Sequence, residues 1–504
     1  MQLDRIQDLD QLRQVARLLA HENDRLHHRL TELLHENARL RGVDGPAQLA
    51  LEIQRLQEQM AVLQRRLFAA SSEKRPAEPA PDPDAPSESP ERPRGHGPRP
   101  QQLPMREVDW TLPEAERRCA TCQGELTEMR GQHEEAEEIT VVQRQFVLLT
   151  HRRQKYRCRC EATVVTAPGP PKLIPGGRYS VDFAVDVAAS KYLDHQPLER
   201  QVRSMARDGL RVDSQTLWDQ LDALAGHQQG NYEALGQRLL AEPVVHADET
   251  WWALLDGRPS KRWWMWSVAS ETGVVYRIAN SRSTEAAGQL LGGYRGVIMA
   301  DGYGAYAALA RAAPGLTLAH CWSHVRRKFI EVQEFYRGPC DEILSLIGEL
   351  FAIERGLPAL RQLQGDTRDE ALHVIRDVRT TQSRRVVDRI RDWAYIQRCT
   401  PGSGLRKAID YMLGLWTGLT RFLDDPRVPL TNNLAERELR TVVVGRKNHY
   451  GSKSRRGTEV AAILYSLLET AQLIGGEPKT YLREATRRAI QHPDAIFLPH
   501  DLLT

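Results

Sequence analysis

The sequence predicts a multidomain protein that combines an N-terminal coiled coil, a small β unit with paired cysteines, a helical region and an α/β core with an inserted all-helical domain. Three observations predict this class. Leucines recur at strict intervals of seven over residues 9–40, two cysteine pairs lie within residues 105–168, and the apolar pattern changes to period two after Pro243. The 504 residues also exceed what one hydrophobic core usually serves.

Composition and charge favour an ordinary soluble protein. Hydrophobic residues make up 41% and charged residues 27% of the chain, and the formal net charge of +3 conceals local clusters of Arg and Lys late in the sequence. No run of about 18 apolar residues is present, and the start MQLDRIQDLDQ lacks the pattern of a signal peptide. We therefore expect a cytoplasmic protein that does not contact a membrane.

Residues 1–70 are predicted to form a leucine-zipper oligomerisation arm. Asparagines at two of the a positions, Asn23 and Asn37, favour a register-fixed parallel dimer, and a homodimer or higher oligomer is expected. A break at residues 42–46 leaves an intramolecular helical hairpin as the alternative. Residues 71–104 are rich in Pro, Glu, Ser and Asp, which predicts a disordered linker. The d positions of the zipper are Leu12, Leu19, Leu26, Leu33 and Leu40.

Residues 105–168 are predicted to form a small zinc-binding β domain. Cys119 and Cys122 form a Cys-x-x-Cys turn, and Cys158 and Cys160 follow a β-like run at 138–150 that is predicted to belong to a hairpin. Four thiolates in a tetrahedron suit a structural Zn²⁺. The second pair is tighter than usual, so His151 remains an alternative ligand, and a unit that has lost its metal remains an alternative to the site.

Residues 175–240 are predicted to be helical and to bind DNA. Within them a helix, a turn at Asp208 and Gly209, and a second helix capped by Ser214 match a helix-turn-helix. The alternative is an ordinary packed pair of helices.

Residues 241–332 are predicted to begin an α/β core. Three strands in a meander, VVHADETWW, KRWWMWSVAS and VVYRIA, precede a helix and two strand-to-helix changes, VIMADGYGAYAALA and LTLAHCWSHVRRKF. This order predicts a mixed sheet covered by helices. The tryptophans of WWMW are interpreted as core or sheet-face residues, with base stacking as the alternative.

Two of these strands carry a carboxylate near their carboxyl end, Asp248 and Asp301. Side by side they would repel each other, and Mg²⁺ relieves such repulsion through oxygen ligands. Glu249 is the alternative to Asp248, but strand alternation points it to the opposite face. A third carboxylate, Glu436, belongs to residues 426–475, which we expect to complete the core on its last helix after a helical insertion at 333–425. A C-terminal tail at 476–504 is expected to follow.

The motifs ADETWW, MADGYGAY, AHCWSHVRRKF and NNLAERELRTVVVGRKNHYGSKSRRG resemble those of the insertion-sequence 66 family of transposases. The resemblance covers nearly the whole chain. It implies a ribonuclease-H-like catalytic core with an Asp, Asp, Glu triad at Asp248, Asp301 and Glu436, and a zinc-binding domain ahead of the core. The paired cysteines depart slightly from the usual spacing, which puts the fourth zinc ligand in doubt.

The reaction that the resemblance implies is hydrolysis of a phosphodiester at a transposon end, followed by attack of the freed 3′-hydroxyl on target DNA. Asp248 would bridge two Mg²⁺ or Mn²⁺ ions, and Asp301 and Glu436 would each hold one. The implied partners are double-stranded DNA, as element ends and target, and accessory proteins from the same element, in the cytoplasm of a bacterium and associated with its nucleoid. A non-catalytic regulator that binds DNA and a nuclease without strand transfer are the competing interpretations.

Several residues are predicted to contact DNA. Asn432 and Asn433 are alternatively groups that support the metal ligands, or caps of the Glu436 helix, and His320, Cys321 and His324 are alternatively a second metal site. The predicted DNA-contacting set is His320, His324, Arg326, Arg327, Lys328, Asn432, Asn433, Arg437, Arg440, Arg446, Lys447 and Lys453.

Overall fold

The computed structural model describes residues 117, 121, 125, 144–157, 164–256, 262–361 and 363–503. The predicted coiled coil, the linker and all four cysteines of the predicted zinc site lie outside these residues. The chain divides into two compact units, Gln64–Arg144 and a second unit that contains Met1–Leu63 and Gln145–Thr504. The described fold belongs almost entirely to the second unit.

A short antiparallel pair of strands precedes the helical region. Strand β1 (Lys155–Arg157) pairs with β2 (Val164–Thr166). The β-like run predicted at 138–150 is wrong in its described part, because residues 144–150 form no strand. Val147, Leu148 and Leu149 are largely exposed there, and a strand without a pairing partner leaves its backbone groups unsatisfied.

Three helices follow, α3 (Val181–Tyr192), α4 (Leu198–Arg207) and α5 (Ser214–Leu239). The predicted turn between the last two is present, with Gly209 at φ +88°. The cap of α5 is Asp213 and not Ser214, because the Asp213 side chain accepts a hydrogen bond from the Thr216 amide at 2.6 Å. Helix α5 contacts α3, α16 and the main sheet. In the structure α5 packs against these elements. Binding of DNA by α4 and α5 as a helix-turn-helix stays a prediction.

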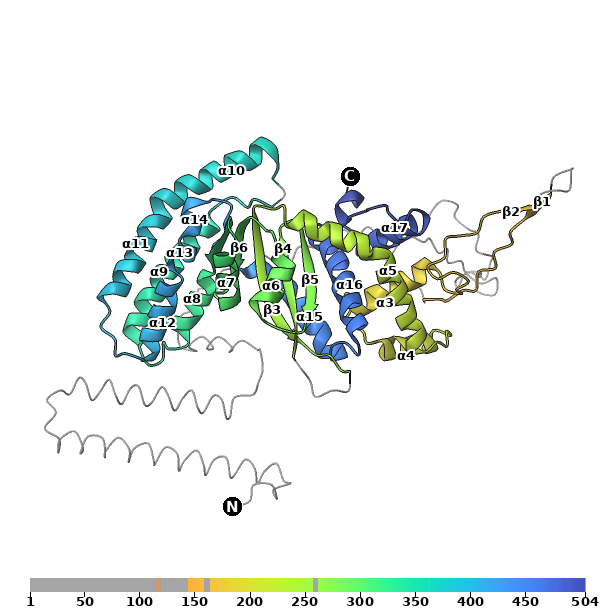
Figure 1. Ribbon diagram of the computed structural model, residues 1–504, viewed down its shortest axis with the longest axis horizontal. Coiled ribbons are helices and arrows are strands. Elements are labelled where there is room, and N and C mark those ends of the chain that lie inside the picture. The colour runs from red at the N-terminus through yellow and green to blue at the C-terminus, as the bar shows by residue number, and fades with distance from the viewer. Residues whose placement is uncertain are drawn as a thin grey trace, which may run out of the picture. The chain divides into compact units, whose positions relative to one another are not determined.

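The core is a five-stranded mixed sheet (Figure 1). Its spatial order is β5-β4-β3-β6-β7; β3, β4 and β5 form an antiparallel meander, and β3, β6 and β7 run parallel. The predicted meander and strand-to-helix changes are therefore confirmed, and the arrangement is consistent with the expected ribonuclease-H-like core. The strands are β3 (Val244–Trp252), β4 (Trp263–Ser270), β5 (Gly273–Ala279), β6 (Gly296–Ala300) and β7 (Leu316–His320).

Helices cover both faces of this sheet. Helices α6 (Thr284–Leu291) and α7 (Gly304–Ala312) pack on the face that buries Val245 and Ile298. The buried Trp266 also packs on this face, edge-to-face against Tyr306, as the core interpretation of WWMW expects for this residue. The other face carries α8 (Trp322–Ile330) and two long helices from the end of the chain, α15 (Asn433–His449) and α16 (Arg455–Leu473).

The predicted helical insertion at 333–425 is helical in its described residues and forms the cyan part of Figure 1. It shares a core with the sheet, since Val297, Met299 and Ala319 pack with its apolar side chains. The buried Arg379 ties the block together by an ion pair with Glu354 and a hydrogen bond to the Phe422 carbonyl, and its hydrogen bonds to the carbonyls of residues 426 and 428 fasten the block to the returning chain. Its elements are α9 (Arg337–Arg355), α10 (Gly365–Val378), the π-helical turn η3 (Arg379–Ser383), α11 (Arg384–Ile396), α12 (Gly404–Gly414), α13 (Trp416–Leu419) and α14 (Arg421–Asp424).

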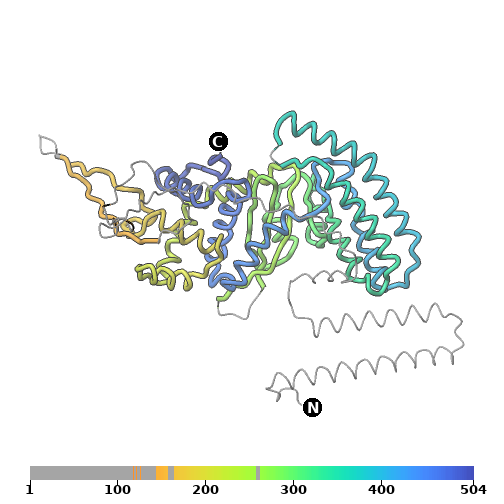
Figure 2. The backbone as a smooth tube through the Cα atoms, turned by 180° about the vertical axis from the view of Figure 1, so that it is seen from behind, coloured from red at the N-terminus to blue at the C-terminus, as the bar shows by residue number. Residues whose placement is uncertain are grey.

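Helix α15 is not the last helix, and residues 476–504 are not a tail. Helix α17 (Pro478–Gln491) and the 3-10 turn η4 (Pro499–Leu502) follow α16. Tyr481, Leu482 and Phe497 are buried in the same core as α3, α5 and α16. Figure 2 shows this end of the chain, in dark blue, beside the helical region that precedes the sheet. Within the described ranges, no helix is both long and apolar enough to cross a membrane.

Candidate active site

Asp248 and Asp301 lie on neighbouring parallel strands. The pairing of β3 with β6 sets Val244 opposite Val297 and His246 opposite Met299. Continued by two residues, the same register brings Asp248 level with Asp301. The expected side-by-side placement of the two strands is confirmed. One detail was wrong: Asp248 does not end its strand, because β3 continues to Trp252 on the β4 side after β6 has ended.

The environment of Asp248 disfavours its charge. Burial, the largest cause, and the negative charges of Glu249, Asp301 and Glu436 together raise the pKa of its carboxyl to about 8, against one hydrogen bond that lowers it. That bond comes from the Glu249 amide at 2.8 Å, and the Ser267 hydroxyl donates to the Asp248 carbonyl. Three other carboxylates therefore lie close enough to act electrostatically on this one.

Asp301 occupies the turn between β6 and α7. Its Oδ1 accepts a hydrogen bond from the Tyr303 amide at 2.9 Å. Gly302 follows at φ +87°, and a Cβ there would lie 2.8 Å from a methyl carbon of Leu415. Only glycine suits this turn, because the backbone is left-handed and the helical block approaches closely. The carboxylate is thus fixed at the end of the strand.

Glu249 points to the opposite face of β3, as strand alternation requires. Its carboxylate accepts hydrogen bonds from Arg282 Nε at 2.7 Å and from the Tyr306 hydroxyl at 2.7 Å. The Arg282 guanidinium lies over the rings of Trp264 and Tyr303, at 4.9 and 3.8 Å from their centroids. Because its charge is already paired, Glu249 is a structural anchor between the sheet and the two helices on that face.

Asn432 fastens the start of α15 to the strand that carries Asp248. Its Nδ2 donates to the Ala247 carbonyl at 3.0 Å, and its Oδ1 lies 2.9 Å from Nδ1 of His246. An amide oxygen only accepts, so Nδ1 of His246 carries the proton. Burial lowers the pKa of His246 to about 4, which keeps the ring neutral at neutral pH. Asn432 is fully buried, which contradicts its predicted contact with DNA, and it occupies the N-cap position of α15 without a side-chain cap bond. Its contacts fit the other predicted role, support of the residues that would hold the metal.

Glu436 lies in the first turn of α15 and meets residues of α8. Its Oε1 is 3.7 Å from Nδ1 of His324. The potential ligand atoms of Cys321, His324 and Glu436 all lie within 4.8 Å of one another. The second metal site that the sequence offered as an alternative consisted of His320, Cys321 and His324. The structure brings two of its members together, replaces His320 with Glu436, and so joins this set to the third predicted carboxylate.

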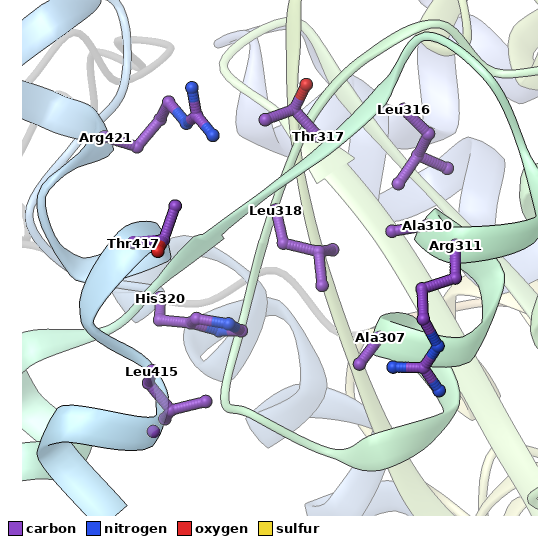
Figure 3. Close-up of a pocket in the computed structure, with 12 residues that line it drawn as sticks. Ala307, Ala310, Arg311, Leu316, Thr317, Leu318, His320, Leu415, Thr417 and Arg421 are labelled. Carbon is purple, nitrogen blue, oxygen red and sulfur yellow. The ribbon is translucent and has the colours of Figure 1, made fainter.

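His320 lies in a groove beside β7, the edge strand of the sheet (Figure 3). The groove has a volume of about 340 Å³, and its walls include Arg311 on α7 and Arg421 on α14. The His320 ring is buried against Gly418, where a Cβ would lie 2.3 Å from ring carbon Cδ2. The negative charge of Asp301 nevertheless acts on this ring, so His320 lies near one of the predicted carboxylates, and its contact with DNA stays a prediction.

Arg446 is also buried, which contradicts its predicted DNA contact. Its guanidinium donates to the Thr250 hydroxyl at 2.9 Å and to the Trp251 carbonyl, and it stacks on the Trp251 ring at 4.0 Å. It therefore holds the end of α15 on β3. The other predicted DNA-contacting residues are exposed or half-buried, and their contacts with DNA stay predictions: His324, Arg326, Arg327, Lys328, Asn433, Arg437, Arg440, Lys447 and Lys453.

Sequence reasoning missed two residues that support the carboxylates, His246 and Arg282. His246 had a signal, because it lies two residues before Asp248 and so on the same face of the strand. Arg282 had none, because it comes from the connection before α6 and reaches Glu249 only through the fold of the sheet.

Comparison with known proteins gives consistent results. The model of the family described as "Transposase IS66 family" matches residues 176–460. The chain is 31% identical over 419 residues to the uncharacterized protein y4jD of Sinorhizobium fredii, and the match covers 78% of each chain. It is 28% identical over 409 residues to the uncharacterized protein y4hP of the same organism, covering 74% of this chain and 71% of that one. The matched family segment contains both predicted aspartates and the predicted glutamate.

Proposed function

Because the chain belongs to the IS66 family of transposases, we propose that it cleaves the ends of an insertion sequence and joins the freed 3′-hydroxyl to target DNA. We place this reaction at Asp248, Asp301 and Glu436. The observation that carries the proposal is the convergence of these carboxylates from two parallel strands and a distant helix, at a position where burial and mutual repulsion already raise the pKa of Asp248.

The donor set fits Mg²⁺ or Mn²⁺. Asp248, Asp301 and Glu436 offer only carboxylate oxygens, which hard divalent cations prefer. Buried Oε1 of Glu436 has no hydrogen-bond partner among the described residues. An unpartnered buried oxygen is costly, and a bound cation relieves that cost. When bound, such ions activate the attacking oxygen and stabilise the leaving oxygen of a phosphodiester.

The residues of the chain hold this arrangement rigid. The Tyr303 amide fixes the Asp301 carboxylate, and the Glu249 amide fixes that of Asp248. Asn432 fixes the start of the helix that carries Glu436. Preorganised ligands lose little freedom when the substrate binds. The exposed cationic side chains of α8 and α15, Arg326 and Arg437 among them, are proposed to meet DNA phosphates.

The rest of the chain is proposed to serve the same reaction. A helix-turn-helix at 175–240 and a zinc unit at Cys119, Cys122, Cys158 and Cys160 would bind element ends, and the coiled coil would join two or more copies that hold paired ends. Accessory proteins of the same element remain expected partners. Bacterial DNA lies in the cytoplasm, so the proposal places the protein there, associated with the nucleoid.

A cleavage and joining assay tests the proposal. Purified protein is incubated with labelled element ends, target DNA and Mg²⁺ or Mn²⁺, and wild type is compared with Asp248→Ala, Glu436→Gln and the surface control Asp424→Asn. We expect cleaved and joined products with wild type and the control, and loss of both with the two site variants. Equal cleavage by wild type and the site variants would refute the triad.

Two other outcomes would identify the competing functions. Cleavage without joined products would favour a nuclease. Specific DNA binding by wild type with no products under any metal condition would favour a non-catalytic regulator. The buried carboxylates argue against the regulator, because a protein that only binds DNA gains nothing from a repulsive cluster that costs stability.

A further inference from the structure

Three different kinds of ligand atom meet at the edge of the candidate active site. Cys321 is the N-cap of α8, His324 lies in the first turn of that helix, and Glu436 lies in the first turn of α15. Their thiol, imidazole and carboxylate ligand atoms lie within 4.8 Å of one another. A thiol and an imidazole contribute nothing to binding Mg²⁺, but they are the ligands that Zn²⁺ and similar cations prefer. The triad chemistry therefore leaves this cluster unexplained.

Two of the three groups also lack a hydrogen-bond partner within the described chain. Nδ1 of His324 and Oε1 of Glu436 are buried atoms without one, and the 3.7 Å between them exceeds a hydrogen bond. A tetrahedral cation with metal–nitrogen and metal–oxygen distances of about 2.0 Å separates two such ligands by about 3.3 Å. For this pair, a contraction of only a few tenths of an ångström matches a bound cation, and the Cys321 sulfur, within 4.8 Å of both atoms, would have to move closer as the cation binds.

The Cys321 sulfur is positioned as the third ligand atom of the cluster. The sulfur accepts a hydrogen bond from the Asn432 amide at 3.2 Å and lies at the amino terminus of α8. Burial raises the pKa of the Cys321 thiol and the charge of Glu436 adds to this effect, whereas backbone N–H groups, that of Asn432 among them, act in the opposite direction. A cation that binds here therefore displaces the thiol proton. Cys321 itself is buried, but the side chains of His324 and Glu436 are 20% and 23% exposed. A cation from solvent reaches the cluster past these two residues.

We propose that Cys321, His324 and Glu436 form a binding site for a thiophilic divalent cation of the Zn²⁺ class, and that its occupation withdraws Glu436 from the Mg²⁺-binding carboxylates. The site is inhibitory: a metal held by sulfur and nitrogen takes the oxygen ligand that the reaction needs. The binding step stands on the geometry of the cluster alone. The inhibitory consequence rests on the proposed transposase function.

Cobalt binding tests the first step without DNA or activity. Co²⁺ replaces Zn²⁺ at such sites, and a Co²⁺–thiolate bond gives a charge-transfer band in the near ultraviolet. The full-length protein is titrated with Co²⁺ as wild type, Cys321→Ser, His324→Gln and the matched control Cys399→Ser, a half-buried cysteine outside the cluster. We expect wild type and the control to bind one more equivalent of Co²⁺, with its thiolate band, than the two cluster variants do.

The outcomes are distinct from those of the transposition assay. Equal Co²⁺ stoichiometry and spectra in wild type and Cys321→Ser would overturn the site, whatever the protein does to DNA. Cys321→Ser is nearly isosteric, and circular dichroism at equal concentration establishes that each variant is folded. If the site binds Co²⁺ but micromolar Zn²⁺ inhibits cleavage equally in wild type and Cys321→Ser, the inhibitory role is wrong. Relief of inhibition by Cys321→Ser, or by excess Mg²⁺ in wild type, supports it.

Discussion

Replacing Asp248 with asparagine should stabilise the protein in the absence of divalent cations. Burial, followed by the negative charges of nearby carboxylates, raises the pKa of Asp248 from its ordinary value of 3.8 to about 8. The unfolded chain keeps the ordinary pKa. Between these two values the folded protein must either take up a proton or bury a repelled charge, so its stability falls as the pH rises from 3.8 towards 8.

The structure sets the size of this effect. One pKa unit corresponds to about 1.4 kcal/mol, so at pH 7 the aspartate lowers the free energy of unfolding by up to about 4 kcal/mol. At pH 5 the same reasoning gives a loss of about 1.5 kcal/mol. Asparagine keeps the shape of the side chain and removes its ionisation. The Asp248→Asn variant should therefore be more stable at both pH values, and by a wider margin at pH 7.

The assay is urea unfolding of wild type and Asp248→Asn, followed by circular dichroism at pH 5 and pH 7 without added divalent cations. Asp424→Asn is the matched control, because Asp424 is largely exposed and its ion pair with Arg384 lies at the surface. The control should change stability little at either pH. The electrostatic account of the site would be refuted if the variant were no more stable than wild type, or if the difference in their free energies of unfolding did not change with pH. Added Mg²⁺ should stabilise wild type more than the variant.

Three further substitutions test contacts that hold the core together, each by urea unfolding against wild type. Gly418→Ala should destabilise the fold by about 1–3 kcal/mol, because the new Cβ would meet the buried His320 ring at 2.3 Å; an unchanged midpoint would show that the ring moves freely. Asn432→Ala should cost about 1–3 kcal/mol by leaving two buried partners unpaired, whereas Asn433→Ala, at an exposed position, should cost little. Arg379→Ala should cost about 3–5 kcal/mol because it leaves a buried carboxylate and three carbonyls without their donor, and a loss below about 1 kcal/mol would contradict that role.

Local pattern was enough to predict the sheet. Period-two alternation in VVHADETWW and its two successors gave the meander, and the apolar runs before Asp301 and Cys321 gave the two parallel strands. The mistakes fell where the outcome depends on contacts between distant segments. The alternation located β3 over Val244–Trp252, but it could not show that β6 pairs only with the first part of this strand, because that depends on where the neighbour ends.

The same limit applies to the charged residues of the candidate site. Arg446 and Asn432 looked like surface groups in a basic segment, yet both are buried against β3. Sequence alone does not tell a basic residue that faces solvent from one that crosses a helix–sheet interface, since both occur in similar helical patterns. Glu436 was the opposite case: its position came from the family resemblance, and only the fold shows it beside His324.

Cys321 and Asn432 are in contact although the whole helical block lies between them in the sequence. The chain leaves the sheet at Cys321 and returns at Asn432, and the amide of Asn432 donates a hydrogen bond to the sulfur of Cys321. Next to this contact the Trp322 amide donates to the Leu430 carbonyl. The two ends of the helical block are therefore tied together at its base, independently of what lies between them. Doubling the length of a flexible connection costs only about 0.6 kcal/mol in closure entropy. Surface connections of the helical block, such as that between α11 and α12 with its exposed Pro401 and Gly402, thus offer places where a tag, a second protein or a new DNA-binding segment can be inserted while the carboxylates keep their spacing.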